Sequence, residues 1–470
     1  MVDRQDALGL PLAKPLFEAA IRELVVSLRG ELVRSEDDGY DKARAVFNGM
    51  VDRRPALIVR CAGVADVVRG VEFARSHNLP LSIRGGGHSV AGKAVCDGGL
   101  MLDLSPMKGI RVDPARRTAE AQAGLTLGEF DHETQEFGLA TTLGVVSVTG
   151  IAGLTLGGGL GWLNGKHGLA CDNLISADVV TADGRLLTAS KEENEDLFWG
   201  IRGGGGNFGV VTSFRYRLHP VGPVLAGGLQ HPAPKARDVL RFYHEFASGC
   251  PDELSTSASL GRAPDGSLVA GITVCYCGAI EEGERVLRPL RTFGSPLEDG
   301  IRPMAYTALQ SAPDEGFPPG KQHYWKSSNL EHLSDEAIEV MVRLVKEMPS
   351  PSSGMGLQQM HGAASRVDPA ATASPHRDEH YDLLILSQWA NPADSEENVR
   401  WTRELFEAMQ PFVGKVVYVN NLGEEEGDRV KEAYGEHYER LVALKDRYDP
   451  TNLFRLNQNV KPTAHSGATS

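Results

Sequence analysis

Hydrophobic and polar residues recur with two different periods between Pro55 and Pro220. Short β-rich or alternating runs predict strands, whereas apolar residues spaced three and four apart predict helices. The strand patterns lie at 56–62, 81–87, 99–105, 109–114 and 118–124, with both arms of a hairpin within 176–190. The helical patterns lie at 64–77 and about 127–137. Because strands outnumber helices, an α+β fold is favoured over a strictly alternating α/β sheet.

A second domain is expected after Pro220, where glycine clusters become rare. Its strand patterns lie at about 267–277 and 381–389, and its helical patterns near 234–248, 279–292, 333–347 and 396–409. A further helix is predicted at 428–446. It is followed by NLFRLNQNV, whose apolar and amide residues predict a buried segment. The last residues, 462–470, are expected to be disordered.

The size and charge of the chain limit its class. A chain of 470 residues is too long to fold around one hydrophobic core, so two or more packed units are expected. A net charge of −14 argues against binding nucleic acid or an anionic membrane, since both need clustered positive charge. No signal peptide or membrane-spanning run is apparent, and the six cysteines form no C-x-x-C pair. We therefore expect a cytoplasmic protein with no membrane partner and no metal site.

Three glycine-rich clusters indicate a ligand with phosphate groups. They are RGGGHSVAG (84–92), GIAGLTLGGGLGW (150–162) and GIRGGGGNFG (200–209). Glycine runs allow backbone N–H groups to converge on phosphates without positive side chains. A P-loop is excluded because Ala94 replaces the required hydroxyl residue. A Rossmann motif at 204–209 is excluded because it follows a helix and precedes a strand.

Several long motifs occur along the chain in an order that is typical of one protein family. They are RGGGHS with a following LDLS, TGIAGLTLGGGLGWL with KHGL and DNL, EDLFWGIRGGGGNFGVVT, and YDPTNLFRLNQN. Together they resemble the bacterial berberine-bridge-enzyme-like members of the vanillyl-alcohol-oxidase superfamily of FAD-linked oxidases. The resemblance implies a two-subdomain, PCMH-type FAD-binding domain at 1–220, completed by 448–470. It also implies a substrate domain at 221–447, built as an antiparallel sheet flanked by helices.

The resemblance further implies FAD bound covalently to His88 through the flavin 8-methyl carbon. A covalent link raises the flavin's affinity for electrons. Some relatives form a second link through a cysteine, but Val146 occupies that position and Cys171 does not match it. A single link is therefore expected. The residues expected to contact FAD are Arg84, Gly85, Gly86, Gly87, His88, Ser89, Gly144, Val148, Thr149, Gly150, Gly153, Gly157, Gly158, Gly209, Val211, Asn457 and Asn459.

Candidate catalytic residues come from the second domain. Oxidation of an alcohol needs a base for the hydroxyl proton. In GKVVYVNN, strand alternation and the resemblance direct Tyr418 and Asn420 towards the flavin. In YWKSSNL, Tyr324 and Lys326 share one strand face. A buried tyrosine beside a cation can have its pKa lowered from ~10, so Tyr418 is the preferred base.

The segment at 361–377 also resembles the family, but it departs from the family's pattern at one position and lacks a carboxylate where some relatives have one. Ser374 stands where an aromatic residue is expected, so the substrate pocket is predicted to be wider there. No Asp or Glu matches the family's carboxylate base before Asp368.

Three functions remain open. The first is an oxidase that takes hydride from a small alcohol, amine or sugar and forms hydrogen peroxide from O₂. The second is a dehydrogenase with a quinone or protein acceptor. The third is a flavin-binding protein without turnover. Relatives act on sugars, alkaloids, phenolics and polyketides, so the FAD motifs do not identify the substrate.

Overall fold

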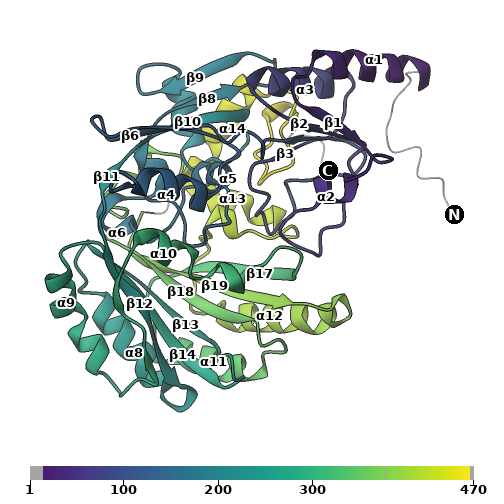
Figure 1. The fold of residues 1–470 in the computed structure, drawn as a ribbon. Coiled ribbons are helices and arrows are strands. Elements are labelled where there is room, and N and C mark those ends of the chain that lie inside the picture. The colour runs from purple at the N-terminus through teal and green to yellow at the C-terminus, as the bar shows by residue number, and fades with distance from the viewer. Residues whose placement is uncertain (1–13, 376, 466–470) are drawn as a thin grey trace.

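The computed structural model describes residues 14–375 and 377–465. These residues form an α+β fold with two smaller sheets on one side and one large antiparallel sheet on the other (Figure 1). The fold class predicted from the sequence is therefore confirmed. Among the described residues, no helix combines the length and apolar character needed to cross a bilayer.

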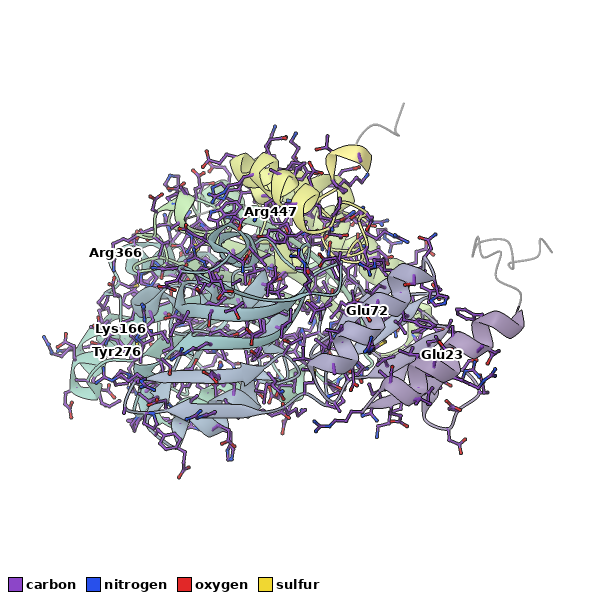
Figure 2. All side chains as sticks on the ribbon, turned by 90° about the horizontal axis from the view of Figure 1, so that it is seen from above. Glu23, Glu72, Lys166, Tyr276, Arg366 and Arg447 are labelled. Carbon is purple, nitrogen blue, oxygen red and sulfur yellow. The ribbon has the colours of Figure 1, made fainter. Side chains whose placement is uncertain are left out.

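The first sheet has four strands in the order β1–β2–β4–β3. They are β1 (Glu31–Arg34), β2 (Leu57–Arg60), β4 (Leu100–Asp103) and β3 (Leu81–Arg84). The last three are mutually parallel. Helix α3 (Val64–Ser76) connects β2 to β3 and buries Val67 and Val71. Helix α1 (Lys14–Ser27) lies along α3, and Figure 2 labels Glu23 and Glu72 on these two helices.

The second sheet is antiparallel and has five strands in the order β5–β6–β10–β8–β9. They are β5 (Ile110–Asp113), β6 (Thr118–Gln122), β10 (Val210–Arg217), β8 (Leu174–Val180) and β9 (Leu186–Ser190). The predicted hairpin is the β8–β9 pair. Three helices that bear on the site belong to this half: α4 (Leu127–Gln135), α5 (Ile151–Leu156) and α7 (Glu195–Ile201). Short elements complete it: α2 (Tyr40–Arg44), α6 (Asn164–His167), β7 (Leu139–Ala140) and β11 (His219–Pro220).

The third sheet is the platform of the second half of the chain. Its main path is β15 (Glu298–Asp299), β12 (Val224–Pro232), β14 (Leu268–Tyr276), β13 (Leu254–Arg262), β18 (Gly354–Met360), β19 (His380–Trp389) and β17 (Gln322–Leu330). Strand β16 (Arg302–Met304) pairs with β12. Four helices pack into one core with this sheet (Figure 1). They are α8 (Ala236–Ala247), α9 (Ile280–Thr292), α11 (Asp335–Leu344) and α12 (Ser395–Met409).

The end of the chain returns to the first half of the molecule. The core around the two smaller sheets includes Val417, Leu444, Phe454 and Val460. Lys445 is fully buried, and its ammonium donates to Asp449 at 2.6 Å and to the carbonyl of Phe454 at 2.9 Å. The last turn of the described chain lies at Thr463–His465. The remainder of the segment predicted to be disordered, 466–470, lies outside the described residues.

Two predicted elements are wrong. Residues 415–418 form no strand, and a 3₁₀ turn follows at Val419–Asn421. The helix predicted at 428–446 is divided into α13 (Val430–Tyr434) and α14 (Tyr438–Tyr448), with a short turn at Gly435–His437 between them. Both segments lie at the junction of the two halves, where tertiary contacts outweigh local periodicity. Strands β12, β13 and β18 were not predicted.

Candidate functional site

The three glycine clusters meet around helix α5. A Cβ atom on Gly86 would lie 2.5 Å from the backbone of Gly150, so the first two clusters touch through glycine backbones. The third cluster joins them because the amides of Gly203 and Gly205 both donate to the carbonyl of Leu156, at 3.0 and 2.9 Å. The three clusters, of which the first and third are more than a hundred residues apart in sequence, thus form one cradle of closely packed glycine backbone, which suits a diphosphate.

The other expected FAD contacts lie in different environments. Gly153 faces open space on α5, whereas Gly144 packs against Leu154. Val148 is 38% exposed. Gly209 and Val211 contact strand β8, so packing within the sheet accounts for both residues. The Thr149 carbonyl accepts from the Leu127 amide, and the Ser89 carbonyl accepts from the Gly92 amide.

Arg84 holds the first glycine cluster in place. Its guanidinium donates two hydrogen bonds to the buried carboxylate of Asp103, at 2.9 and 2.7 Å. It also donates to the carbonyls of Ala43 and Ala45. The positive charge of Arg84 is therefore paired with the Asp103 carboxylate within the protein. Its side chain orients the loop that leads to His88.

His88 is enclosed by aromatic side chains. Its ring stacks on Phe47 with centroids 4.0 Å apart, and Trp325 of β17 lies 6.5 Å away. Burial lowers the pKa of His88 to about 4, so the imidazole is neutral at physiological pH. Its Nε2 is buried and has no hydrogen-bond partner among the described residues. A neutral, half-buried imidazole whose buried Nε2 lacks a partner among the described residues fits a covalent attachment site.

A small, partly open cavity lies where the second glycine cluster meets the third sheet. Its lining is mostly apolar, with a few polar side chains from both halves of the molecule. The lining residues are Gly157, Leu160, Leu169, Gly203, Asn329, Met360, Ser374, Pro375, His380, Asp382, Val417, Tyr418, Val419, Ala433 and Tyr434. None of these described residues is Lys or Arg. The composition suits a largely apolar small molecule with few polar groups.

Asp382 is the acidic residue in this lining, and sequence analysis missed it. It is 5% exposed and accepts hydrogen bonds from Ser327 at 3.0 Å and from Asn421 at 2.8 Å. Burial raises the pKa of the carboxyl to about 6, although these two hydrogen bonds oppose the shift. A signal was present in the sequence, because Asp382 is a charge within an otherwise apolar strand, YDLLIL.

Tyr418 lies in the same cavity as Asp382. Its hydroxyl accepts a hydrogen bond from the Gly159 amide at 2.9 Å and one from Asn420 at 2.8 Å. Asn420 also contacts Gly157 so closely that a side chain there would collide with its amide. Burial raises the pKa of Tyr418 to about 12. The lowered pKa expected from the sequence is wrong, because an amide and a backbone N–H, instead of a cation, contact the hydroxyl.

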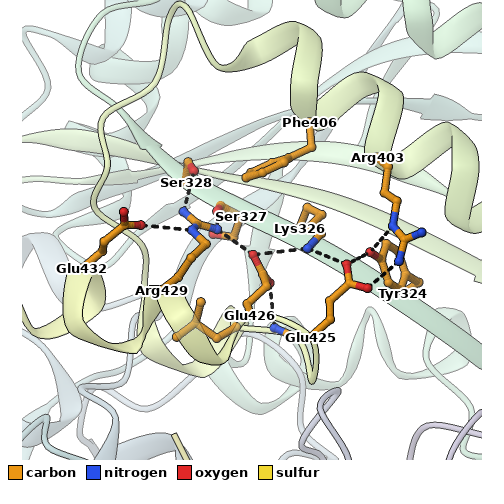
Figure 3. Close-up of polar contacts among 12 residues, drawn as sticks. Tyr324, Lys326, Ser327, Ser328, Arg403, Phe406, Glu425, Glu426, Arg429 and Glu432 are labelled. Carbon is orange, nitrogen blue, oxygen red and sulfur yellow. Dashed lines mark hydrogen bonds and ion pairs between the residues drawn. The ribbon is translucent and has the colours of Figure 1, made fainter. Parts of the chain in front are cut away.

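Tyr324 and Lys326 lie in a separate charged cluster (Figure 3). The two residues share a face of β17, as predicted, and this face packs against α12. Lys326 forms ion pairs with Glu425 at 2.8 Å and Glu426 at 3.4 Å, and Tyr324 donates to Glu425. This placement favours a structural role for both residues, which hold the loop after Tyr418. Their catalytic role remains an untested prediction.

The opposite face of β17 connects His88 with the cavity. Trp325, beside His88, and Asn329, in the cavity wall, are four residues apart and therefore point to the same face. Four residues of strand span ~13 Å. Asn329 pairs with Asp382 on the neighbouring strand. A planar ring attached at His88 could thus lie along this face and reach Asp382.

The two C-terminal amides also fit a bound cofactor. The amide nitrogen of Asn457 donates to the carbonyls of Gly206 and Phe454. The side-chain oxygens of Asn457 and Asn459 are buried without a partner among the described residues. Buried acceptors that lack donors are expected where a ligand supplies them.

Comparisons with known proteins agree with this site. The family model described as FAD binding domain matches residues 55–190, and the one described as berberine and berberine like matches 417–461. An FAD-linked oxidoreductase of Dictyostelium discoideum is 33% identical, over 94% of this chain and 97% of that protein. (R)-6-hydroxynicotine oxidase of Paenarthrobacter nicotinovorans is 32% identical, over 93% and 98%. The crystal structure of 6-hydroxy-D-nicotine oxidase from Arthrobacter nicotinovorans superposes with a TM-score of 0.86 at 30% identity, covering 93% of this chain and 98% of that one.

Proposed function

The chain belongs to the berberine-bridge-enzyme-like family of FAD-linked oxidoreductases, and we propose that it is an oxidase acting on a small, largely apolar amine or alcohol. The observation that carries this proposal is the cavity that combines Asp382 and Tyr418 with the glycine cluster at 157–159. When bound, FAD would accept hydride from the substrate and pass the electrons to dioxygen, giving hydrogen peroxide.

The protein's own part in this reaction is binding and proton transfer. The Asp382 carboxylate takes the proton from the substrate's hydroxyl or amine, because its pKa of about 6 leaves it ionised at neutral pH. Tyr418 holds the substrate's heteroatom with the O–H that its two accepted hydrogen bonds leave free. The apolar walls at Leu169 and Met360 exclude water and bind the body of the substrate.

The charge of the lining supports the proposed substrate class. The described lining residues provide a carboxylate and no Lys or Arg, so a substrate with a carboxylate or phosphate group would lack a partner. An amine or a neutral hydroxyl would instead interact with Asp382. The amine oxidised by (R)-6-hydroxynicotine oxidase is of this kind, and we place cyclic amines first among the candidates.

Reduction of the flavin by substrate under anaerobic conditions tests this function. A panel of cyclic amines, phenolic alcohols, sugars and polyketides is mixed with the holoenzyme, and bleaching of the flavin absorbance is followed. We expect bleaching by an amine or a phenolic alcohol, and peroxide on admission of air. Bleaching without peroxide would indicate a dehydrogenase. No bleaching by any class would contradict the proposed oxidase and favour a flavin-binding protein without turnover.

We further propose a single covalent link between His88 and FAD. Acid precipitation should leave the flavin with the wild-type protein, whereas His88→Ala should release it into the supernatant. His77→Ala is the control, since His77 packs against Phe73 in the same half of the molecule with ring centroids 4.2 Å apart, and it should retain the flavin. Wild-type flavin that washes free would contradict the link.

The proposal also includes a cytoplasmic location. All six cysteines are free thiols, which suits a reducing compartment.

A further inference from the structure

Three segments of the chain meet at the ring of His88. The first is the glycine loop that carries His88. The second is the loop before it in sequence, where the Phe47 amide donates to the carbonyl of Gly87 at 3.0 Å. The third is the start of β17, from the other half of the molecule, where the His323 ring stacks on Phe47 with centroids 4.3 Å apart.

The three rings form one continuous stack. The His88 and His323 rings lie 15° and 25° from the plane of Phe47, at 4.0 and 4.3 Å. Two rings so close and so nearly parallel to a third would overlap on one side of it, so they occupy its two faces. His323 is 1% exposed, and neither of its ring nitrogens has a hydrogen-bond partner among the described residues. Hydrogen bonds of the ring therefore do not explain how the imidazole is oriented, whereas stacking on Phe47 does.

Asn48 locks this stack together. Its side chain donates to the carbonyls of Val90 and His323, at 2.8 and 2.9 Å, and accepts from the His323 amide at 3.0 Å. The next residue, Gly49, donates to the carbonyl of Lys321 at 2.7 Å. Hydrogen bonds that cross between the two halves of the molecule thus determine where His323 and Phe47 lie.

We propose that Phe47 and His323 are positioning residues that hold the His88 ring for covalent attachment of the flavin. The proposal rests on the covalent link proposed above. In the reaction, a C–H bond of the flavin 8-methyl group and the N–H bond of the imidazole break, and one C–N bond forms. The two protons and two electrons released are taken by dioxygen, which becomes hydrogen peroxide.

On this proposal, attachment of the flavin to His88 depends on β17 as well as on the glycine loop that carries His88. His323 reaches the stack only when β17 is docked against the loop around Asn48, so attachment at the full rate requires both halves of the molecule to be folded together. A ring free to rotate would present its nitrogen in the attack direction only part of the time. Loss of such orientation slows a reaction by about 10–100-fold.

The test measures the covalent share of the flavin and needs no substrate. The holoprotein is purified after short and long expression, and the flavin in the acid pellet is compared with the total bound. Phe47→Leu and His323→Ala should bind flavin, yet attach it about 10–100-fold more slowly than wild type. His323→Phe keeps a planar ring and should attach flavin like wild type.

Matched controls come from the large sheet and its helices. Phe242→Leu removes a ring that stacks on Phe293 at 4.0 Å. His231→Ala removes a fully buried histidine whose two ring nitrogens also lack partners among the described residues. Both should attach flavin at the wild-type rate. Slow attachment in all four variants would show a general loss of folding and overturn the specific role.

Each remaining result has a defined meaning. Wild-type attachment in both Phe47→Leu and His323→Ala would overturn the proposal. If His323→Ala lost its flavin entirely, His323→Gln would decide, because glutamine fills similar space without a ring: slow attachment supports the stack, and wild-type attachment refutes it. Flavin that is not covalent in the wild type would instead refute the link to His88.

Discussion

At the scale of single residues, burial separates the acid–base roles of Asp382 and Tyr418. Both line the same cavity, and both have raised pKa values because charge is poorly solvated there. The resulting values, about 6 and about 12, lie on opposite sides of neutrality. At neutral pH the carboxylate can therefore accept a proton, whereas the phenol already holds one. Tyr418 is better suited to bind the substrate than to act as the base.

We expect Asp382→Asn to slow flavin reduction by about 10²–10⁴-fold, the usual cost of losing a general base. A base acts in its ionised form, so the wild-type rate should rise with pH through about 6 and then level off. The variant should lack this rise. Stopped-flow reduction by a true substrate, measured from pH 5 to 8, checks both points.

Asp131→Asn is the matched control for this prediction. Asp131 is fully buried, and burial raises its pKa to about 7 as it raises that of Asp382, but its partner is Gln310 and it lies outside the cavity. Its variant should reduce flavin at the wild-type rate. If both asparagine variants behaved alike, Asp382 would not be the base.

At the scale of elements, a buried ion pair positions the segment that leads into β19. Arg377 is 1% exposed, and its guanidinium donates two parallel hydrogen bonds to Asp172, both at 2.8 Å. Asp172 belongs to the 3₁₀ turn Ala170–Asn173 of the first half. The segment between Thr372 and Arg377 supplies Ser374 to the cavity wall. The pair thus connects the glycine-rich half to the wall of the cavity that contains Ser374.

Arg377→Met should lower the free energy of unfolding by about 3–5 kcal/mol, because it leaves the Asp172 carboxylate buried without its partner. Arg366→Met provides the comparison, since Arg366 and Asp252 form an ion pair with side chains 61% and 39% exposed. Exposed pairs contribute about 0–1 kcal/mol. Urea unfolding of both variants measures the difference, and equal losses would contradict the role of the buried pair.

At the scale of the whole molecule, the end of the chain packs onto the half that contains the glycine clusters. The side chain of Asn207, within the third glycine cluster, donates to the carbonyl of Gln458 and accepts from the amide of Val460. Lys445 donates to the Asn207 carbonyl as well as to Asp449. Contacts across more than two hundred residues of sequence therefore support the third glycine cluster.

Truncation after Tyr448 should reduce the flavin bound per protein, because it removes Asp449 and the partners of Asn207. The control is truncation after Lys461, which keeps these contacts and should bind flavin normally. The ratio of flavin absorbance to protein measures the outcome. Full flavin content in the shorter protein would show that the C-terminal segment is dispensable for binding.

Elements whose signal is local were predictable. The hairpin at 176–190 and the helix at 64–77 follow from alternation, period and turn residues, because each packs a regular apolar face onto a core. The close approach of backbone at the glycine clusters was also predictable from the sequence, since such an approach requires the absence of a side chain. The long motifs supplied the family and, with it, the expectation of FAD.

The tertiary structure decided which of these residues face one another. Sequence places Tyr324 and Lys326 on one face of β17, but only the packing of α12 shows that this face points away from His88. Likewise, only the fold brings Asp382 to Tyr418 and His323 to Phe47. Sequence periodicity describes a side chain relative to its own element. Its neighbours and its pKa depend on burial, which distant parts of the chain create together.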